Sequence, residues 1–167
     1  MACRGVLFAL TQDQAEKLRS LDDDDSRLEY LQEEIAEHFF ENEPERKAET
    51  DKSWDAIHRC LTDGKLEYNN GTYPLNHTIL GGELLYSGDD YIMSLKTPEQ
   101  VKDIAKALYN VEEIEFKRNY NKINAKEYGP NFGDEDCNYT WDWFNDLKPF
   151  WEKASSEGRF VIFLADQ

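Results

Sequence analysis

Two short apolar runs lie near the two ends of the chain. Residues 6–9 and 160–164 are rich in β-branched and aromatic side chains, a composition typical of buried strands. Strands as apolar as these must be covered by other elements. We therefore predict that both runs belong to one small sheet, mixed or antiparallel, covered by several helices. The predicted fold class is α+β, with residues 1–167 forming a single domain.

Between these runs, apolar residues recur every three or four positions, which is the pattern of amphipathic helices. The clearest helix follows Thr97, because Pro98 suits the first helical position and Gln100 completes a capping box. Another helix carries an apolar stripe opposite a glutamate-rich face. That stripe consists of Leu28, Leu31, Ile35 and Phe39.

Other helices and loops are predicted from caps and turn residues. Shorter helices are expected after Thr11, from Thr50 or Ser53 onward, and over residues 111–121. The last helix is predicted to be capped by Asp134 and to end at Gly158. Pro149 should kink or divide it, because proline lacks the N–H group that the helix needs. Loops are expected over residues 42–49, 65–97 (apart from a strand at about 91–95) and 124–133.

The charge is strongly unbalanced, with 19 basic against 35 acidic residues and a net charge of −16. Such a chain repels a nucleic-acid backbone, so nucleic acid is not expected as a partner. Much of the excess lies in residues 21–51, where five Asp and eight Glu oppose three basic residues, a net charge of −10. This stretch is either a solvated helix face, the simpler interpretation, or a surface that binds a basic protein.

The chain carries no sign of a membrane span or a disulfide framework. It has no run of about 18 apolar residues and no long apolar stretch typical of a secretory signal, so a cytoplasmic location without membrane contact is expected. Three widely separated cysteines without a C-x-x-C pair indicate reduced thiols. The Asn-X-Thr sequences at Asn70, Asn76 and Asn138 are expected to be chance matches. No cofactor is predicted.

One segment resembles a known family. Residues 51–62 read Asp-Lys-Ser-Trp-Asp-Ala-Ile-His-Arg-Cys-Leu-Thr, and they are followed by Pro74-Leu75 and Ile79-Leu80-Gly81-Gly82. This pattern resembles the YfbM-like family, small bacterial proteins grouped as a domain of unknown function. The resemblance implies an α+β fold and an intracellular bacterial protein. It implies no established reaction, cofactor or catalytic residue.

Within that segment, Trp54, Asp55 and His58 lie on or beside one helix face. Asp55 and His58 are candidates for a general acid and base pair, or for two metal ligands. In the structural interpretation, Trp54 fills the core while Asp55 and His58 bind backbone groups of the neighbouring loops. The structural interpretation is favoured, because buried polar groups ordinarily have hydrogen-bond partners.

A metal site would need further ligands. His77 together with Asp89 or Asp90 is a candidate to join His58 as a His/His/carboxylate set. The spacing matches no metal-binding motif, so no metal is predicted. Gly81 and Gly82 form neither a nucleotide-binding nor a phosphate-binding pattern and are interpreted as turn residues.

Other catalytic patterns are also missing from the sequence. There is no G-x-S-x-G motif, and Cys60 is expected to be a buried structural thiol. The aromatic residues around Trp141 and Trp151 are assigned to core packing.

Two functional hypotheses follow. In the first, the chain is a protein-binding module of the inhibitor or immunity type that uses the acidic surface of residues 21–51. In the second, it is an enzyme or small-ligand-binding domain that uses Trp54, Asp55, His58 and the loops of residues 81–90.

Overall fold

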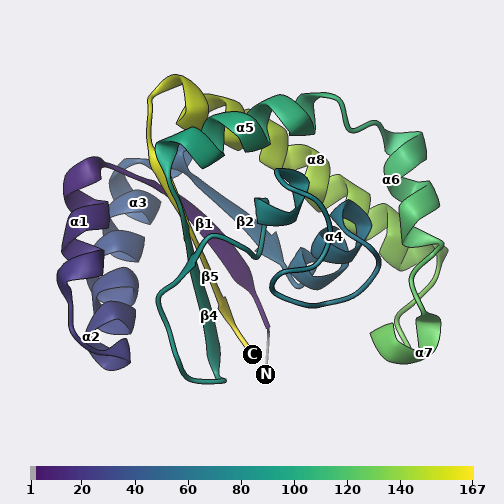
Figure 1. Cartoon of the computed structure of the whole chain (residues 1–167), viewed down its shortest axis with the longest axis horizontal. Helices are drawn as coiled ribbons and strands as arrows, with labels where there is room; N and C mark the ends of the chain where they lie inside the picture. Colours follow the sequence, from purple (N-terminus) through teal and green to yellow (C-terminus); the bar gives the residue numbers. More distant parts are fainter. Residues whose placement is uncertain (1–2) are drawn as a thin grey trace.

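An antiparallel sheet of five strands runs through the centre of the computed structural model, which describes residues 3–167 (Figure 1). The strands are β1 (Gly5–Leu10), β2 (Lys47–Asp51), β3 (Glu83–Leu84), β4 (Tyr91–Lys96) and β5 (Phe160–Asp166). They lie in the order β2-β1-β5-β4-β3. The two terminal strands are neighbours, with Gly5 opposite Ala165 and Leu10 opposite Phe160. The predicted α+β class, with both terminal runs in one sheet, is confirmed.

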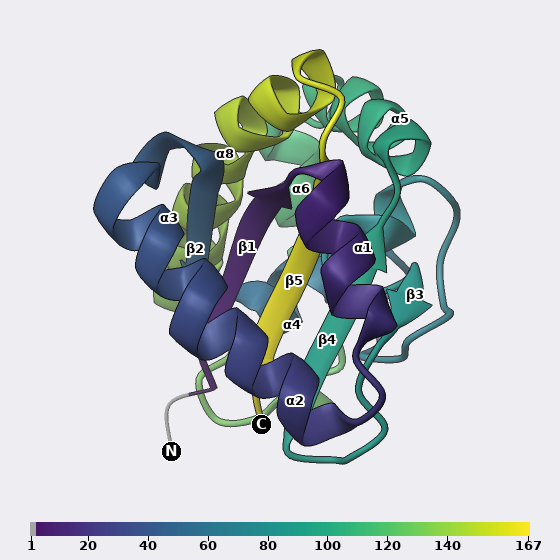
Figure 2. The same cartoon turned by 90° about the vertical axis from the view of Figure 1, so that its left-hand side faces the viewer.

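Helices cover both faces of the sheet. One face carries α1 (Gln12–Ser20), α2 (Asp24–Glu29) and α3 (Ala36–Asn42), and a π-helical turn (Tyr30–Ile35) joins α2 to α3 (Figure 2). The other face carries α4 (Trp54–Leu61), α5 (Pro98–Tyr109), α6 (Glu113–Tyr120) and α8 (Asp134–Ser156), and the short α7 (Ala125–Tyr128) lies beyond α6 (Figure 1). Two short 3₁₀ turns span Pro44–Arg46 and Leu75–His77.

The alternation of side chains along each central strand creates two separate hydrophobic cores. In β1, Leu7 and Ala9 pack with α4, α5 and α8, whereas Phe8 and Leu10 pack with α1 and α3. All four side chains are at most 2% exposed. This double burial explains why the strand is an uninterrupted apolar run.

The predicted capping box of α5 is present. The Gln100 N–H donates to Thr97 Oγ1 at 3.3 Å, and the Thr97 N–H donates to Gln100 Oε1 at 3.0 Å. Three of the four residues of the stripe predicted on the glutamate-rich helix are buried, since Leu31, Ile35 and Phe39 are at most 2% exposed, whereas Leu28 is partly exposed. Its π-helical turn has no counterpart in the prediction.

The loop predicted over residues 42–49 is partly wrong, because residues 47–51 form the edge strand β2. The sequence Lys-Ala-Glu-Thr-Asp has no apolar alternation. Its strand conformation comes from antiparallel pairing with β1, where Ala48 lies opposite Leu7 and Glu49 opposite Val6. Charged residues are common on edge strands, where they hinder pairing with other chains.

Three details between residues 124 and 158 also differ from prediction. The expected loop contains α7, a single turn that Asn124 caps through the N–H groups of Lys126 and Glu127. Gly133, rather than Asp134, occupies the N-cap of α8. Pro149 does not divide α8, which continues from 134 to 156. Phe144, Phe150 and other side chains on both sides of the proline are buried in the core.

Candidate functional site

α4 directs Trp54 into the core. The indole is 4% exposed, and its Nε1–H donates to the Cys3 carbonyl oxygen at 2.8 Å. The ring lies 5.8 Å, centroid to centroid, from that of Phe163 on β5. Trp54 thus fastens α4 to the central strand and to the chain just before β1.

Asp55 pairs with an arginine one helical turn further along α4. Arg59 Nε donates to Asp55 Oδ1 at 2.6 Å, and the Arg59 guanidinium lies 5.5 Å from the centroid of the Tyr128 ring. Arg59 is only 8% exposed, so the pair lies at the edge of the core. Among the described residues, no hydrogen bond joins Asp55 to His58, the candidate acid and base pair.

His58 binds the loop that follows α4. Its Nε2 lies 2.7 Å from Asn70 Oδ1 and 2.9 Å from the Glu67 carbonyl oxygen. Both partners are acceptors, so Nε2 carries the hydrogen and the unpartnered Nδ1 does not. Burial lowers the pKa of His58, although its two hydrogen bonds act in the opposite direction. The imidazole is therefore a neutral donor that holds the loop.

Asn70 is the centre of that loop, and its role was missed by the sequence analysis, which interpreted it as part of a chance Asn-X-Thr match. Its Nδ2 donates to Asp63 Oδ1 at 2.6 Å and to the Lys65 carbonyl oxygen at 2.8 Å, and it is 8% exposed. The adjacent Asn-Asn-Gly turn was the available signal, since asparagine side chains commonly hold turns together.

His77 and the two glycines lie further along the same loop region. His77 Nδ1 donates to Asn76 Oδ1 at 2.8 Å. Gly81 and Gly82 have φ angles of +84° and +82°, the left-handed region that suits glycine. A Cβ at Gly82 would lie 2.5 Å from the Leu95 carbonyl oxygen, so this turn requires glycine to approach β4.

Behind this turn, the structure holds a buried lysine that the sequence analysis did not select. Lys96 is 0% exposed; its Nζ donates to the Ile79 carbonyl oxygen and lies 2.6 Å from Ser94 Oγ. Burial lowers the pKa of Lys96 well below its ordinary value. Ser94 and Lys96 occupy alternate positions on β4, a polar pattern usually read as a solvated face, but the segment around Ile79 covers them.

Asp89 and Asp90 lie at the other end of β4. Asp90 Oδ1 accepts from the Tyr86 hydroxyl at 3.0 Å, and the main-chain carbonyl oxygens of both aspartates accept from Gln167. The structure therefore does not bring them to His77. Within residues 3–167, no group of three or more His, Cys, Asp or Glu side chains is placed to hold a metal ion.

The residues around α4 act mainly through bonds to their own chain. His58, Asn70, Lys96 and Tyr68 each direct polar atoms to the segment between residues 63 and 82. Cys60 is 1% exposed, and burial raises the pKa of its thiol well above the ordinary value, so the thiolate required for nucleophilic attack is disfavoured. The chemistry of this cluster is that of a hydrogen-bonded support for a long loop.

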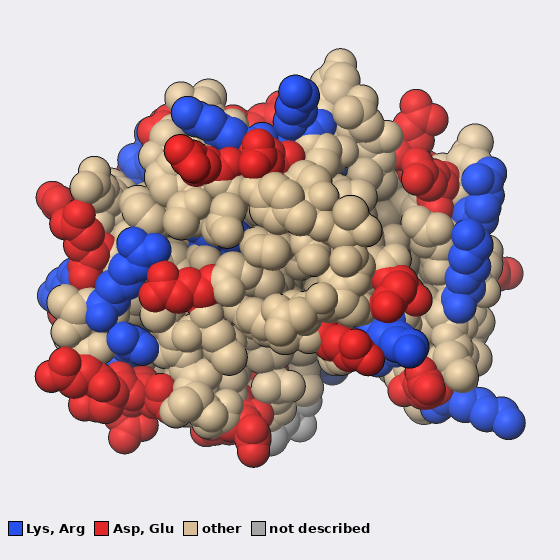
Figure 3. All heavy atoms as spheres, in the orientation of Figure 1, with Lys and Arg blue, Asp and Glu red and all other residues tan. Residues whose placement is uncertain are grey.

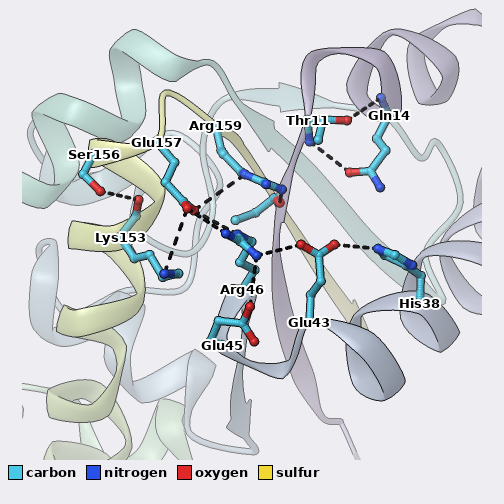
Figure 4. A network of polar contacts seen from close by, with 11 residues as sticks. Thr11, Gln14, His38, Glu43, Glu45, Arg46, Lys153, Ser156, Glu157 and Arg159 are labelled. Carbon is cyan, nitrogen blue, oxygen red and sulfur yellow. Dashed lines mark hydrogen bonds and ion pairs between the residues drawn. The ribbon is translucent and has the colours of Figure 1, made fainter.

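The acidic segment of residues 21–51 divides into paired and unpaired carboxylates. One paired group surrounds Arg46, whose guanidinium donates to Glu43 at 2.7 Å, Glu45 at 2.9 Å and Glu157 at 2.8 Å (Figure 4). The hydrogen bond from Arg46 lowers the pKa of Glu157. This network ties the end of α3 to the junction of α8 and β5. Glu34, Glu49 and Asp51 form separate ion pairs with other basic residues.

Five of the unpaired carboxylates form a row along α2, the π-helical turn and α3. We call it the acidic ladder, and it consists of Asp25, Glu29, Glu33, Glu37 and Glu41. All five side chains are exposed, and none makes an ion pair or a side-chain hydrogen bond with another described residue. Figure 3 shows acidic side chains gathered at the lower left, where α2 lies in Figure 1. The sequence analysis predicted an acidic face here but not this regular row.

These features define the class of the protein. It is an α+β domain whose antiparallel sheet carries helices on both faces, and the helices on one face present a strongly acidic surface. The chain belongs to the family described as Domain of unknown function (DUF1877), whose model matches residues 1–164. The YfbM-like resemblance is thereby confirmed. No helix within residues 3–167 is long and apolar enough to cross a membrane.

The fold is similar to a solved structure. The crystal structure of YfbM, a protein of unknown function from Escherichia coli, matches with a TM-score of 0.63 and 15% sequence identity, covering 97% of this chain and 99% of that chain. At this identity the likeness concerns the fold alone. No curated protein matches the chain.

Proposed function

We propose that this chain is a cytoplasmic protein-binding module of the inhibitor or immunity type. It binds a cationic partner protein through the acidic surface of residues 21–51. The observation that supports this most directly is the acidic ladder, because its five exposed carboxylates have no partner within the described chain.

The spacing of the ladder favours a continuous binding surface. Its members are four residues apart, slightly more than one α-helical turn, so a row on a plain α-helix would drift around the axis by about 40° at each step. The π-helical turn of residues 30–35 lies in the middle of the row. Because a π-helical turn contains more residues than an α-helical turn, it counteracts this drift.

The ladder also stands on a rigid base. The opposite side of the same helices buries Leu31, Ile35 and Phe39 against the sheet, and Lys17 on α1 pairs with Glu34 at 3.2 Å. A surface held in this way loses little conformational entropy when a partner binds. Its like charges repel one another until a cationic surface arrives, and they accelerate the association with such a surface.

The enzyme or ligand-binding alternative, which uses Trp54, Asp55, His58 and the loops of residues 81–90, has weaker support. The polar atoms of these residues are directed mainly to the loop and to Arg59 rather than to a shared cavity. Asp89 and Asp90 lie at the far end of β4 from Gly82.

The test compares capture of partners from a host lysate by three immobilised proteins, at low and high salt. They are the wild type, a Glu33→Lys/Glu37→Lys variant, and a control Glu99→Lys/Glu115→Lys variant with the same charge change on α5 and α6. We expect the wild type and the control to retain one partner that the ladder variant loses, and high salt to release it because exposed charges are screened.

The captured partner is then purified and its affinity measured for each variant. A loss of at least about tenfold, or about 1.4 kcal/mol, in the ladder variant alone supports the proposal. Equal affinity for the ladder variant, or binding that does not depend on salt, contradicts it.

A further inference from the structure

A second surface lies on the opposite face of the sheet from the acidic ladder. Here a groove of about 490 Å³ runs between the C-terminal parts of α5 and α8. We call it the α5–α8 groove, and it is lined by Lys102, Ala105, Lys106, Tyr109, Asn110, Glu152, Ser155 and Ser156. The small side chains of Ser155 and Ser156 leave it open along α8.

Part of the groove lining is apolar. Ala105, which is 8% exposed, contributes to its lining, and Tyr109 stands beside it with 75% of its surface exposed. Ile114, at the start of α6, is 73% exposed. Tyr109 and Ile114 are the two most exposed large hydrophobic side chains among residues 3–167. Tyr109 lines the groove, whereas Ile114 lies outside its lining.

The charge of the groove has the opposite sign to that of the whole molecule. Lys102 and Lys106 lie one helical turn apart on α5, both are exposed, and neither side chain makes an ion pair or hydrogen bond with a described residue. Glu152 contributes a single negative charge from α8. In a chain with a net charge of −16, two adjacent unpaired lysines beside an exposed tyrosine form a locally positive, partly apolar site.

We propose that the α5–α8 groove docks an amphipathic helical segment of a partner protein that carries two carboxylates one turn apart beside an apolar side chain. The carboxylates bind Lys102 and Lys106, and the apolar side chain packs against Ala105 and Tyr109. A groove between two helices suits a helical ligand, and carboxylates spaced by four residues match the spacing of the lysines. The inference goes beyond the proposed function, because it concerns another face and a ligand of opposite charge.

The charge of the molecule argues against a second copy of this chain as the occupant. Two molecules that each carry −16 repel one another over the whole approach. A partner segment with two acidic residues and little further charge meets far less of this repulsion.

The test uses two synthetic amphipathic peptides of identical sequence, except that one has Glu and the other Lys at two positions four residues apart. Binding is measured by fluorescence anisotropy at low salt. We expect the wild-type chain to bind the Glu peptide at least about tenfold more tightly than the Lys peptide. The Lys102→Glu/Lys106→Glu variant should reverse this preference.

Two further variants separate docking in the groove from general attraction. Arg118→Glu/Lys122→Glu makes the same charge change at the same spacing near the end of α6, outside the groove, and should keep the wild-type preference. Ser155→Trp fills the groove without changing any charge and should weaken binding of the Glu peptide by at least about tenfold. The Glu33→Gln/Glu37→Gln variant of the acidic ladder should bind like the wild type, so this test is independent of the proposed function.

The proposal is overturned if the wild type binds neither peptide or binds both equally. It is also overturned if the α6 variant loses the preference as completely as the α5 variant, or if Ser155→Trp leaves the affinity for the Glu peptide unchanged.

Discussion

His58 and Lys96 are buried bases whose hydrogen-bond partners are neutral groups. His58 donates to an amide oxygen and a carbonyl oxygen, and Lys96 contacts a carbonyl oxygen and a hydroxyl group. Burial lowers the pKa of both. The folded chain therefore favours their neutral forms. Because both side chains bind the loop at residues 63–82, the stability of this loop should depend on pH.

His58 contributes to the pH dependence of stability. Its pKa in the folded state lies below the ordinary value of about 6.5, so the unfolded chain binds more protons as pH falls through that value. We expect the free energy of unfolding to decrease as pH falls from about 7 to about 5, and to decrease less in His58→Gln. Urea denaturation at several pH values measures this.

His77→Gln is the comparison for this experiment. Burial also lowers the pKa of His77, but that side chain is only half-buried. Its replacement should therefore flatten the pH dependence less than His58→Gln does. Parallel curves for the wild type and His58→Gln would show that the buried imidazole is not held neutral.

Trp54 offers a test of the structural role of α4. Because its indole is 4% exposed and bonded to the Cys3 carbonyl oxygen, Trp54→Ala should cost about 3–5 kcal/mol of unfolding free energy. Trp54→Phe keeps a ring against Phe163 and should cost less. A Trp54→Ala protein that unfolds at the wild-type urea midpoint would contradict this role and indicate a functional one.

For single residues, the sequence indicated which side chains are chemically notable better than it indicated their hydrogen-bond and ion-pair partners. The pattern around Trp54 and His58 was visible, and Arg59, four residues after Asp55 on the same helix, could have been predicted as its partner from helix spacing alone. Asn70 as the partner of His58 depends on how the loop packs against α4. Lys96 was not selected because a lysine on a strand is normally solvated. Only the covering segment near Ile79, brought there by the tertiary fold, buries it.

Helices and strands with a capping or apolar pattern of their own could be predicted from the sequence. Those whose conformation depends on neighbouring elements could not. The capping boxes of α1 and α5 and the apolar runs of β1 and β5 act within a few residues of sequence. β2, by contrast, owes its conformation to β1, and α8 continues past Pro149 because its flanking side chains are buried. Tertiary packing outweighed local preference in both cases.

The acidic ladder gives a prediction at the scale of the helix. Glu33 and Glu37 take part in three like-charge contacts between residues four apart, each of which destabilises a helix by about 0.2–0.5 kcal/mol. The Glu33→Gln/Glu37→Gln variant should therefore gain about 0.6–1.5 kcal/mol of unfolding free energy at low salt. Thermal or urea unfolding measures the gain, which should shrink as salt screens the charges.

A matched control for this stability experiment is Glu99→Gln/Glu115→Gln. These two carboxylates are exposed on α5 and α6 and make no ion pair with a described residue. Both lie in the first turns of their helices, where a negative charge is favourable, and neither belongs to a regular row of like charges, so their replacement should not stabilise the chain. An equal gain in both variants would mean that overall charge, rather than the ladder, destabilises the fold.

For the whole molecule, the sheet separates two surfaces of different character. The acidic ladder lies on the side of α1, α2 and α3, and the α5–α8 groove lies on the side of the larger core (Figures 1 and 2). The net charge of −16 acts on both, since it attracts cations to the first surface and opposes anions at the second. The two surfaces differ in charge because different helices form them. The order of these helices in the sequence does not show which face of the sheet each helix covers.

This net charge also determines how salt should affect folding. At low ionic strength the Debye length is about 30 Å, so carboxylates across the whole molecule repel one another, whereas at physiological ionic strength it is about 8 Å. Salt also weakens ion pairs such as those of Arg46, but these pairs are partly buried, so salt screens them much less than it screens exposed charges. We expect self-repulsion to dominate in a chain of net charge −16, so that the melting temperature rises as potassium chloride is added.

The ladder variant shows where that repulsion is concentrated. Glu33→Gln/Glu37→Gln should start from a higher melting temperature and rise less with salt than either the wild type or Glu99→Gln/Glu115→Gln, because part of the repulsion that salt screens has already been removed. Calorimetry over a series of potassium chloride concentrations measures both quantities. A melting temperature that falls with added salt in the wild type would mean that the ion pairs around Arg46 outweigh the repulsion, and that the ladder does not strain the free protein.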